Sequence, residues 1–188
     1  VGCPGPDRAV EGPGGWAAYP AAAFAMGGAP TSRVDAVLRE EKGYTYGIRS
    51  SFRPRRRGGL FLTSGSVRAD VTAAALGELV EILDSGRAGF TVAEVSGAAD
   101  FLSLTAPGRY ATADVVADEA AAFALEGLTT RFTTALLRDL PWLTPEVVTE
   151  AYRRFVDGRW TIVVVGDAAA HAAAVESLGV GAVTVVSA

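Results

Sequence analysis

Two side chains in this sequence have types and a spacing that suit chemistry. Arg39 lies near the end of a segment with helical periodicity, and Tyr46 follows seven positions later, where a strand pattern begins. A guanidinium and a phenol hydroxyl both donate hydrogen bonds, so together they suit backbone carbonyls or a developing oxyanion. A plain alternative stays open. Arg39 would then only favour the negative end of a helix dipole, and Tyr46 would be a strand aromatic packed on its neighbours.

The other reactive residue types do not form a complete catalytic set. His171 is the only histidine, and neither HExxH nor HxxEH occurs, so we predict no metal or cofactor site in this chain. Cys3 is the only cysteine, which excludes an internal disulfide, and it lacks the paired motif of a nucleophile. The turn Val164-Val165-Gly166-Asp167 lacks a phosphate-binding motif, and we interpret it as a strand-to-helix turn capped by Asp167.

A basic run, Arg53-Pro54-Arg55-Arg56-Arg57, raises the question of nucleic-acid binding. The chain as a whole is acidic, with a net charge of −4 and a pI near 5.1, so it has no global attraction to nucleic acid. We interpret the run as a solvated hairpin tip with a turn proline, and we predict that nucleic acid is not a partner.

Length and composition indicate a single domain over residues 1–188. An apolar fraction of 49% and a mean hydropathy of +0.26 allow a substantial core. No apolar run approaches the roughly 18 residues that a membrane span needs, so we predict no membrane contact. The sequence begins at Val1 without a signal pattern, which favours a fragment or a processed piece. The compartment stays open, with the cytoplasm favoured.

Hydrophobic periodicity predicts an α+β fold in which helices cover a mainly antiparallel sheet. Residues 1–15 are expected to form a loop or the end of a truncated strand. In the strand 46–53, alternation would place Tyr46 on one face with Ile48, Ser50 and Phe52. The expected helices are 16–26, 32–43, 69–83, 91–104, 112–137 with a break near Gly127, 144–156 and 168–178, and the expected strands are 46–53 and 60–68 as a hairpin, 161–165 and 182–186.

The segment around the arginine and the tyrosine also carries a family resemblance. Its main residues are Met26-Gly27-Gly28, Ser32-Arg33 and Leu38-Arg39-Glu40-Glu41-Lys42-Gly43-Tyr44-Thr45-Tyr46-Gly47. This block resembles the second-domain signature of the pitrilysin/insulinase-like zinc peptidases, family M16, and is most similar to the short M16B or processing-peptidase type. Weaker similarity continues downstream, through Thr91/Glu94, Thr144-Pro145-Glu146 and the strand end at Gly166-Asp167.

The resemblance implies half of an enzyme. In such peptidases, one domain carries an HxxEH zinc site, and the facing domain contributes an arginine and a tyrosine that bind the substrate backbone. Arg39 and Tyr46 match those two positions. The resemblance therefore implies that this chain has no zinc ligands, is inactive alone, and positions a peptide for an HxxEH-bearing partner domain or subunit that holds the zinc.

Two rival hypotheses follow from the same sequence. The chain could be a non-catalytic scaffold or interaction subunit that has kept the fold, although the presence of both Arg39 and Tyr46 argues against that role. It could also be an unrelated α+β binding domain, because short motifs can mislead. The polypeptide or gene that accompanies this chain would separate the first rival from the peptidase hypothesis, since only the latter requires an HxxEH motif there.

Overall fold

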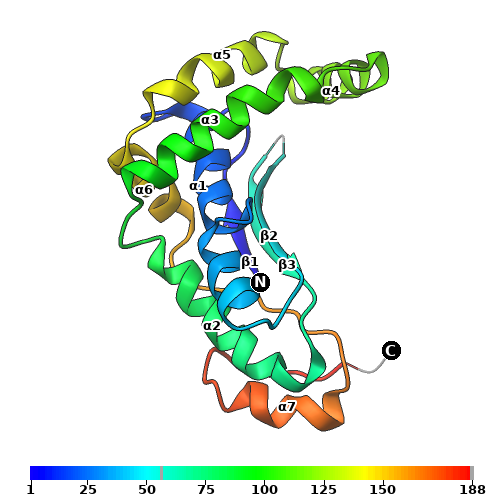
Figure 1. Ribbon diagram of the computed structural model, residues 1–188. Coiled ribbons are helices and arrows are strands. Elements are labelled where there is room, and N and C mark those ends of the chain that lie inside the picture. Colours follow the sequence, from blue (N-terminus) through cyan, green and yellow to red (C-terminus); the bar gives the residue numbers. More distant parts are fainter. Residues whose placement is uncertain (56, 187–188) are drawn as a thin grey trace.

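A computed structural model describes residues 1–55 and 57–186, and it has the predicted α+β fold (Figure 1). Its sheet is antiparallel with the strand order β1-β3-β2, where β1 is Gly2–Gly5, β2 is Ile48–Pro54 and β3 is Gly59–Gly65. Strands β2 and β3 are the predicted hairpin, and β1 lies within the segment predicted as a loop or strand end. Arg56 of the basic run lies outside the described residues.

The helices follow the predicted order, with short 3₁₀ turns at several ends and a π-helix in place of the expected α-helix after Ser32. Their bounds are η1 Gly15–Ala17, α1 Ala18–Gly27, η2 Asp35–Glu41, η3 Ala69–Val71, α2 Thr72–Ser85, α3 Val92–Arg109, α4 Ala113–Glu126, α5 Arg131–Asp139, η4 Leu140–Trp142, α6 Pro145–Phe155 and α7 Ala168–Glu176.

Helix α1 lies against one face of the sheet and also packs on α3 and α6 (Figure 1). Its alanines bring the helix backbone close to the strands, and a β-carbon at Gly27 would lie only 2.5 Å from Ser50 Oγ. The core between these layers is rich in aromatic rings. Phe61 and Tyr152 are fully buried and meet edge to face with ring centres 5.7 Å apart. This rigid core supports the segment between α1 and β2.

Local sequence signals set several helix ends as expected. Thr91 and Glu94 form a reciprocal capping box at the start of α3, and Thr144 accepts a hydrogen bond from the Val147 N–H at the start of α6. Gly127 has a left-handed backbone and separates α4 from α5. These ends follow from side chains within one turn, which is why the sequence predicts them.

The predicted strands 161–165 and 182–186 are not formed. Thr161 makes one isolated bridge, in which its N–H and carbonyl pair with Gly2 at 2.8 and 2.9 Å. The valines that follow are open to solvent, with Val163 at 75% and Val165 at 94% exposure. A run of β-branched residues forms a strand only where a neighbouring strand offers free N–H and C=O groups. Apart from the bridge between Gly2 and Thr161, no described strand pairs with residues 161–165.

None of the helices in the described ranges is both long enough and apolar enough to cross a bilayer.

Candidate functional site

Arg39 lies on the π-helix η2, which is anchored to the core from one side. Val34 and Leu38 are fully buried, and the Ser32 hydroxyl accepts a hydrogen bond from the Asp35 N–H at 3.4 Å. At the other end, Lys42 forms an ion pair with Glu78 of α2 at 3.1 Å. The helix is therefore held at both ends, as a segment that presents a side chain to a ligand must be.

The first residue of this helix, Asp35, is a buried carboxylate. Asp35 is fully buried, and its Oδ2 is 2.9 Å from Arg49 Nη1 and 3.9 Å from Arg39 Nη1. Its Oδ1 accepts a hydrogen bond from the Ile48 N–H at 3.5 Å. Burying a carboxylate is costly unless cations and donors surround it, so these contacts explain why it is tolerated. Asp35 thereby ties η2 to the first residues of β2.

Arg39 keeps most of its hydrogen-bonding capacity free. Its side chain is 40% exposed, and its contacts are ion pairs at 3.9 Å to Asp35 and 3.5 Å to Glu40. Both distances are too long for strong charge-assisted hydrogen bonds, and no hydrogen bond of the Arg39 guanidinium to another described residue is formed. Since a guanidinium carries five N–H donors, most of them are available to a ligand.

The loop that precedes Tyr46 is fixed by backbone contacts. Gly43 ends η2 with φ of +62°, a conformation that favours glycine. The Tyr44 N–H donates to the Leu38 carbonyl at 2.8 Å, and the Tyr44 carbonyl accepts from the Arg68 N–H at 3.0 Å. The Tyr44 side chain packs against the core. The chain therefore leaves the helix along one defined path.

The backbone on both sides of Tyr46 is held by one hydroxyl. Thr45 Oγ1 donates to the Ser66 carbonyl at 2.6 Å and accepts from the Gly47 N–H at 3.0 Å. Tyr46 itself is fully exposed. The backbone around Tyr46 is therefore fixed, while its side chain meets only solvent.

The sequence prediction for the surroundings of Tyr46 was wrong in one respect. Strand β2 begins at Ile48, and Gly47 interrupts the alternation with φ of +158°, so Tyr46 does not share the buried face of Ile48, Ser50 and Phe52. The plain alternative of a packed strand aromatic is wrong for the same reason. The structure shows no contact between Arg39 and Tyr46 themselves, and their proposed joint role stays a prediction.

The other candidate residues have ordinary surroundings. Cys3 is buried in β1, and burial together with the nearby Asp157 raises the pKa of its thiol to about 11, which suits a core residue rather than a nucleophile. His171 is half-buried in α7, and Asp167 caps that helix by accepting from the Ala170 N–H. Within residues 1–55 and 57–186, no three His, Cys, Asp or Glu side chains gather as metal ligands.

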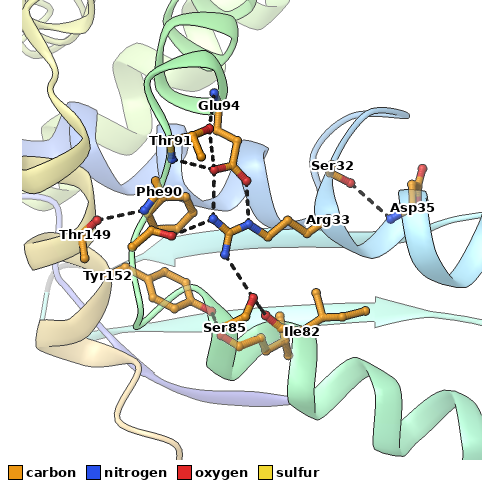
Figure 2. A network of polar contacts seen from close by, with 12 residues as sticks. Ser32, Arg33, Asp35, Ile82, Ser85, Phe90, Thr91, Glu94, Thr149 and Tyr152 are labelled. Carbon is orange, nitrogen blue, oxygen red and sulfur yellow. Dashed lines mark hydrogen bonds and ion pairs between the residues drawn. The ribbon is translucent and has the colours of Figure 1, made fainter.

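A dense polar network surrounds Arg33, which lies between α1 and η2 (Figure 2). Arg33 donates through Nε and Nη2 to both carboxylate oxygens of Glu94, at 2.6 and 2.9 Å. It also donates to the Ser85 hydroxyl at 3.0 Å and to the Gly89 carbonyl at 2.7 Å. Its guanidinium lies over the Phe90 ring, 5.0 Å from the centre. With its donors occupied, Arg33 joins α2, α3 and the α1–η2 segment.

Neither Arg39 nor Tyr46 lines the shallow groove beside η2. That groove is bounded by Arg33, Ala36 and Val37 on one side and by α2 residues such as Glu78 and Glu81 on the other. The candidate pair is thus on an open surface rather than in a pocket. A ligand bound there would meet only one wall formed by the described residues.

Sequence reasoning missed Asp35 and Arg49 as parts of this site. The spacing of Asp35 and Arg39 is i, i+4, which on a helix is a signal for an ion pair. No local signal indicated Arg49, because its contact with Asp35 joins two elements across a loop.

Known structures resemble this chain in fold. The peptidase M16 inactive domain from Pseudomonas fluorescens matches with a TM-score of 0.73 and 24% identity, over 84% of this chain and 38% of that one. A proposed zinc protease from Bordetella pertussis Tohama I matches with a TM-score of 0.61 and 17% identity, over 82% of this chain and 85% of that one. The periplasmic protease PqqL from Escherichia coli matches with a TM-score of 0.60 and 14% identity, over 83% of this chain and 17% of that one.

No protein-family model and no curated protein matches the sequence. The structural likeness nevertheless shows that the chain has the fold of an M16 inactive domain, as the sequence resemblance predicts. The M16B subtype stays a prediction. The chain spans 38% of the Pseudomonas chain and 17% of PqqL, so any activity of a whole protein is a matter for proposal.

Proposed function

We propose that this chain is the substrate-positioning half of an M16-like metallopeptidase and works with an HxxEH-bearing partner domain or subunit. The observation that carries the proposal is the pair of uncommitted donors on a fixed backbone. Arg39 has free N–H groups, and Tyr46 is fully exposed although the residues on both sides of it are hydrogen-bonded. An M16 inactive-domain fold is the context in which such a pair is expected.

In this proposal Arg39 binds the backbone of an extended peptide. A peptide held as a strand offers a row of carbonyl oxygens, and a guanidinium can donate to one or two of them in a fork. The buried Asp35 carboxylate lies 3.9 Å from Arg39 Nη1, so it favours a position of the guanidinium near the start of η2 without using its hydrogen bonds. Fixing the peptide in this way lowers the entropy cost of bringing the scissile bond to the reactive groups.

Tyr46 has a different role in the same proposal. Its hydroxyl donates to the carbonyl oxygen of the bond under attack, where negative charge grows in the transition state. A phenol serves well because its hydroxyl donates one directional hydrogen bond. The ring is uncovered in this chain, so it would become desolvated only when a partner domain and a peptide close over it.

This chain does not itself fit a zinc site, since His171 is its only histidine and the described residues contain no cluster of ligands. In the proposed arrangement, zinc and the general base therefore belong to the partner, and this chain supplies only binding and hydrogen bonding. The open position of the donor pair supports that division, because a facing wall is needed to complete a pocket.

The test is reconstitution with the HxxEH-bearing polypeptide that accompanies this chain. Peptide cleavage is expected only when both parts are present, and Arg39→Ala or Tyr46→Phe should each lower kcat/KM by about 10²–10³-fold. Turnover by either variant at the level of the unmodified protein would refute the role proposed for that residue. If no HxxEH polypeptide accompanies the chain, the non-catalytic scaffold hypothesis replaces this one.

A further inference from the structure

The surface beside the candidate donors carries more arginine than the described carboxylates there neutralise. Arg49 and Arg53 are exposed and lie on the outward face of β2, two alternations apart. Arg39 approaches the same surface from η2, since Arg39 Nη1 and Arg49 Nη1 both lie within 4 Å of the same Asp35 oxygen, at 3.9 and 2.9 Å. Arginines from two elements therefore converge next to the loop that holds Tyr46.

The excess positive charge of this cluster comes from Arg53. Asp35 and the mostly exposed Glu40 supply two negative charges beside the guanidiniums of Arg39 and Arg49. Arg53 donates to the Ser51 hydroxyl at 3.3 Å, and no ion pair with a described carboxylate is formed there. The chain as a whole carries a net charge of −4, so this local excess of positive charge runs against its average composition.

Gly47 lets one of these cations lie against the backbone next to Tyr46. A β-carbon at residue 47 would be 3.2 Å from Arg49 Nη1 and 3.4 Å from its Cζ, which is tighter than side chains normally allow. The guanidinium of Arg49 therefore lies against the backbone of the residue that follows Tyr46. Its side chain is 53% exposed, and Asp35 and the Ile48 carbonyl hold Nη1 at 2.9 and 3.0 Å. The remaining donors are free to meet a ligand.

We propose that Arg49, together with Arg53, recognises an acidic side chain of the peptide substrate close to the bond that Tyr46 contacts. This inference rests on the proposed function and adds a substrate class to it, namely extended peptides with Asp or Glu on one side of the scissile bond. A guanidinium binds a carboxylate through two parallel hydrogen bonds, which gives both attraction and direction. Asp35 acts as a positioning residue, because it holds Arg49 against Gly47.

The test uses the protein as it occurs, together with any HxxEH-bearing part that accompanies it. Three labelled peptides of equal length differ only in one residue beside the scissile bond, which is Glu, Gln or Lys. Binding is measured by fluorescence anisotropy, and cleavage by product formation. We expect the Glu peptide to bind about tenfold more tightly than the Gln peptide, as one charge-assisted pair would give, with the Lys peptide weakest.

Variants separate this site from general charge effects. Arg53→Gln should lower the Glu/Gln binding ratio several-fold without affecting folding, because Arg53 is exposed and lacks an ion pair with any described carboxylate. Arg49→Gln should reduce the Glu/Gln binding ratio further. Because this change removes the closest cation of the buried Asp35, the circular dichroism spectrum of the variant is recorded to check that it is still folded. Arg109→Gln, at an exposed position on α3, is the matched control and should leave the ratio unchanged.

The outcomes distinguish the two proposals. Equal binding of the Glu and Gln peptides, or a ratio that Arg53→Gln and Arg49→Gln leave intact, overturns the acidic preference even if the peptides are cleaved. Acid-selective binding without cleavage supports the preference and counts against the proposed function. If no peptide binds, both are refuted.

Discussion

Arg33 and Arg39 lie six residues apart on one segment and have opposite surroundings. Arg33 makes hydrogen bonds to Glu94, Ser85 and Gly89, with distances from 2.6 to 3.0 Å (Figure 2). Arg39 has only ion pairs at 3.5 and 3.9 Å among the described residues, with 40% of its side chain exposed. Arginine is chemically the same in both places, so the difference lies in whether the fold has already used its donors.

The tyrosines repeat this contrast. Tyr152 is fully buried, its hydroxyl donates to the Leu83 carbonyl at 2.8 Å, and burial raises its pKa. Tyr46 is fully exposed. Residues of the first kind hold the fold together, whereas residues of the second kind are free for a partner. The comparison predicts that stability and activity can be separated by mutation within this one region.

The largest expected effect is on turnover, and it distinguishes two neighbouring tyrosines. With the HxxEH partner present, Tyr46→Phe should lower kcat by about 10²–10³-fold, since it removes one donor to the developing charge. Tyr44→Phe is the matched control, because that ring packs against the core and its loss of a hydroxyl should leave kcat unchanged. An equal loss from both variants would show that the loop, not the hydroxyl, matters.

The next effect is on stability, and it is expected at Arg33. Arg33→Ala removes four hydrogen bonds and leaves the Glu94 carboxylate without its cation, so the free energy of unfolding should fall by about 2–3 kcal/mol. Urea denaturation of both proteins measures this difference. A change close to zero would mean that the network in Figure 2 does not join α2 and α3 as described.

A smaller, pH-dependent effect is expected at Glu94. Partial burial opposes its charge, but the hydrogen bonds from Arg33 and from the Thr91 N–H outweigh it and hold the pKa of Glu94 below its usual value. A carboxyl with a lowered pKa stabilises the fold above its unfolded pKa of about 4.3, and that stabilisation is lost as pH falls through the folded pKa.

Glu94→Gln should therefore cost about 1–2 kcal/mol at pH 7, and the difference from the unmodified protein should shrink below about pH 4. Unfolding curves recorded between about pH 3 and pH 7 give the free-energy difference at pH 7 and its decrease at low pH. A difference that does not depend on pH would assign the effect to packing or capping rather than to the charge of Glu94.

The smallest expected change in the free energy of unfolding is at Arg39. Arg39→Ala should lower the free energy of unfolding much less than Arg33→Ala does, since both of its contacts are long and the buried Asp35 keeps its closer ion pair with Arg49 at 2.9 Å. The same variant should still lower kcat/KM in the proposed function. The denaturation experiment used for Arg33→Ala measures the change in the free energy of unfolding. A loss as large as that of Arg33→Ala would show that Arg39 serves the fold, which is the plain alternative for this residue.

Short-range patterns in the sequence account for the local structure and for the chemical types at the site. Helix starts at Thr91 and Thr144, the break at Gly127 and the β2–β3 hairpin all depend on interactions within a few residues, so they were predictable. The α+β class followed from the order of these elements. The resemblance around Arg39 and Tyr46 indicated the M16 fold, which the known structures confirm.

Contacts between distant elements of the fold determine which of these side chains already have hydrogen-bond partners. The arginines and tyrosines near this surface look alike in sequence, but Arg33 is occupied by Glu94 from another helix, whereas Arg39 and Tyr46 are not. The valines at 163–165 have β-propensity, yet they stay exposed because no described strand lies opposite them. Contacts between distant segments set both results, and no local pattern in the sequence encodes them.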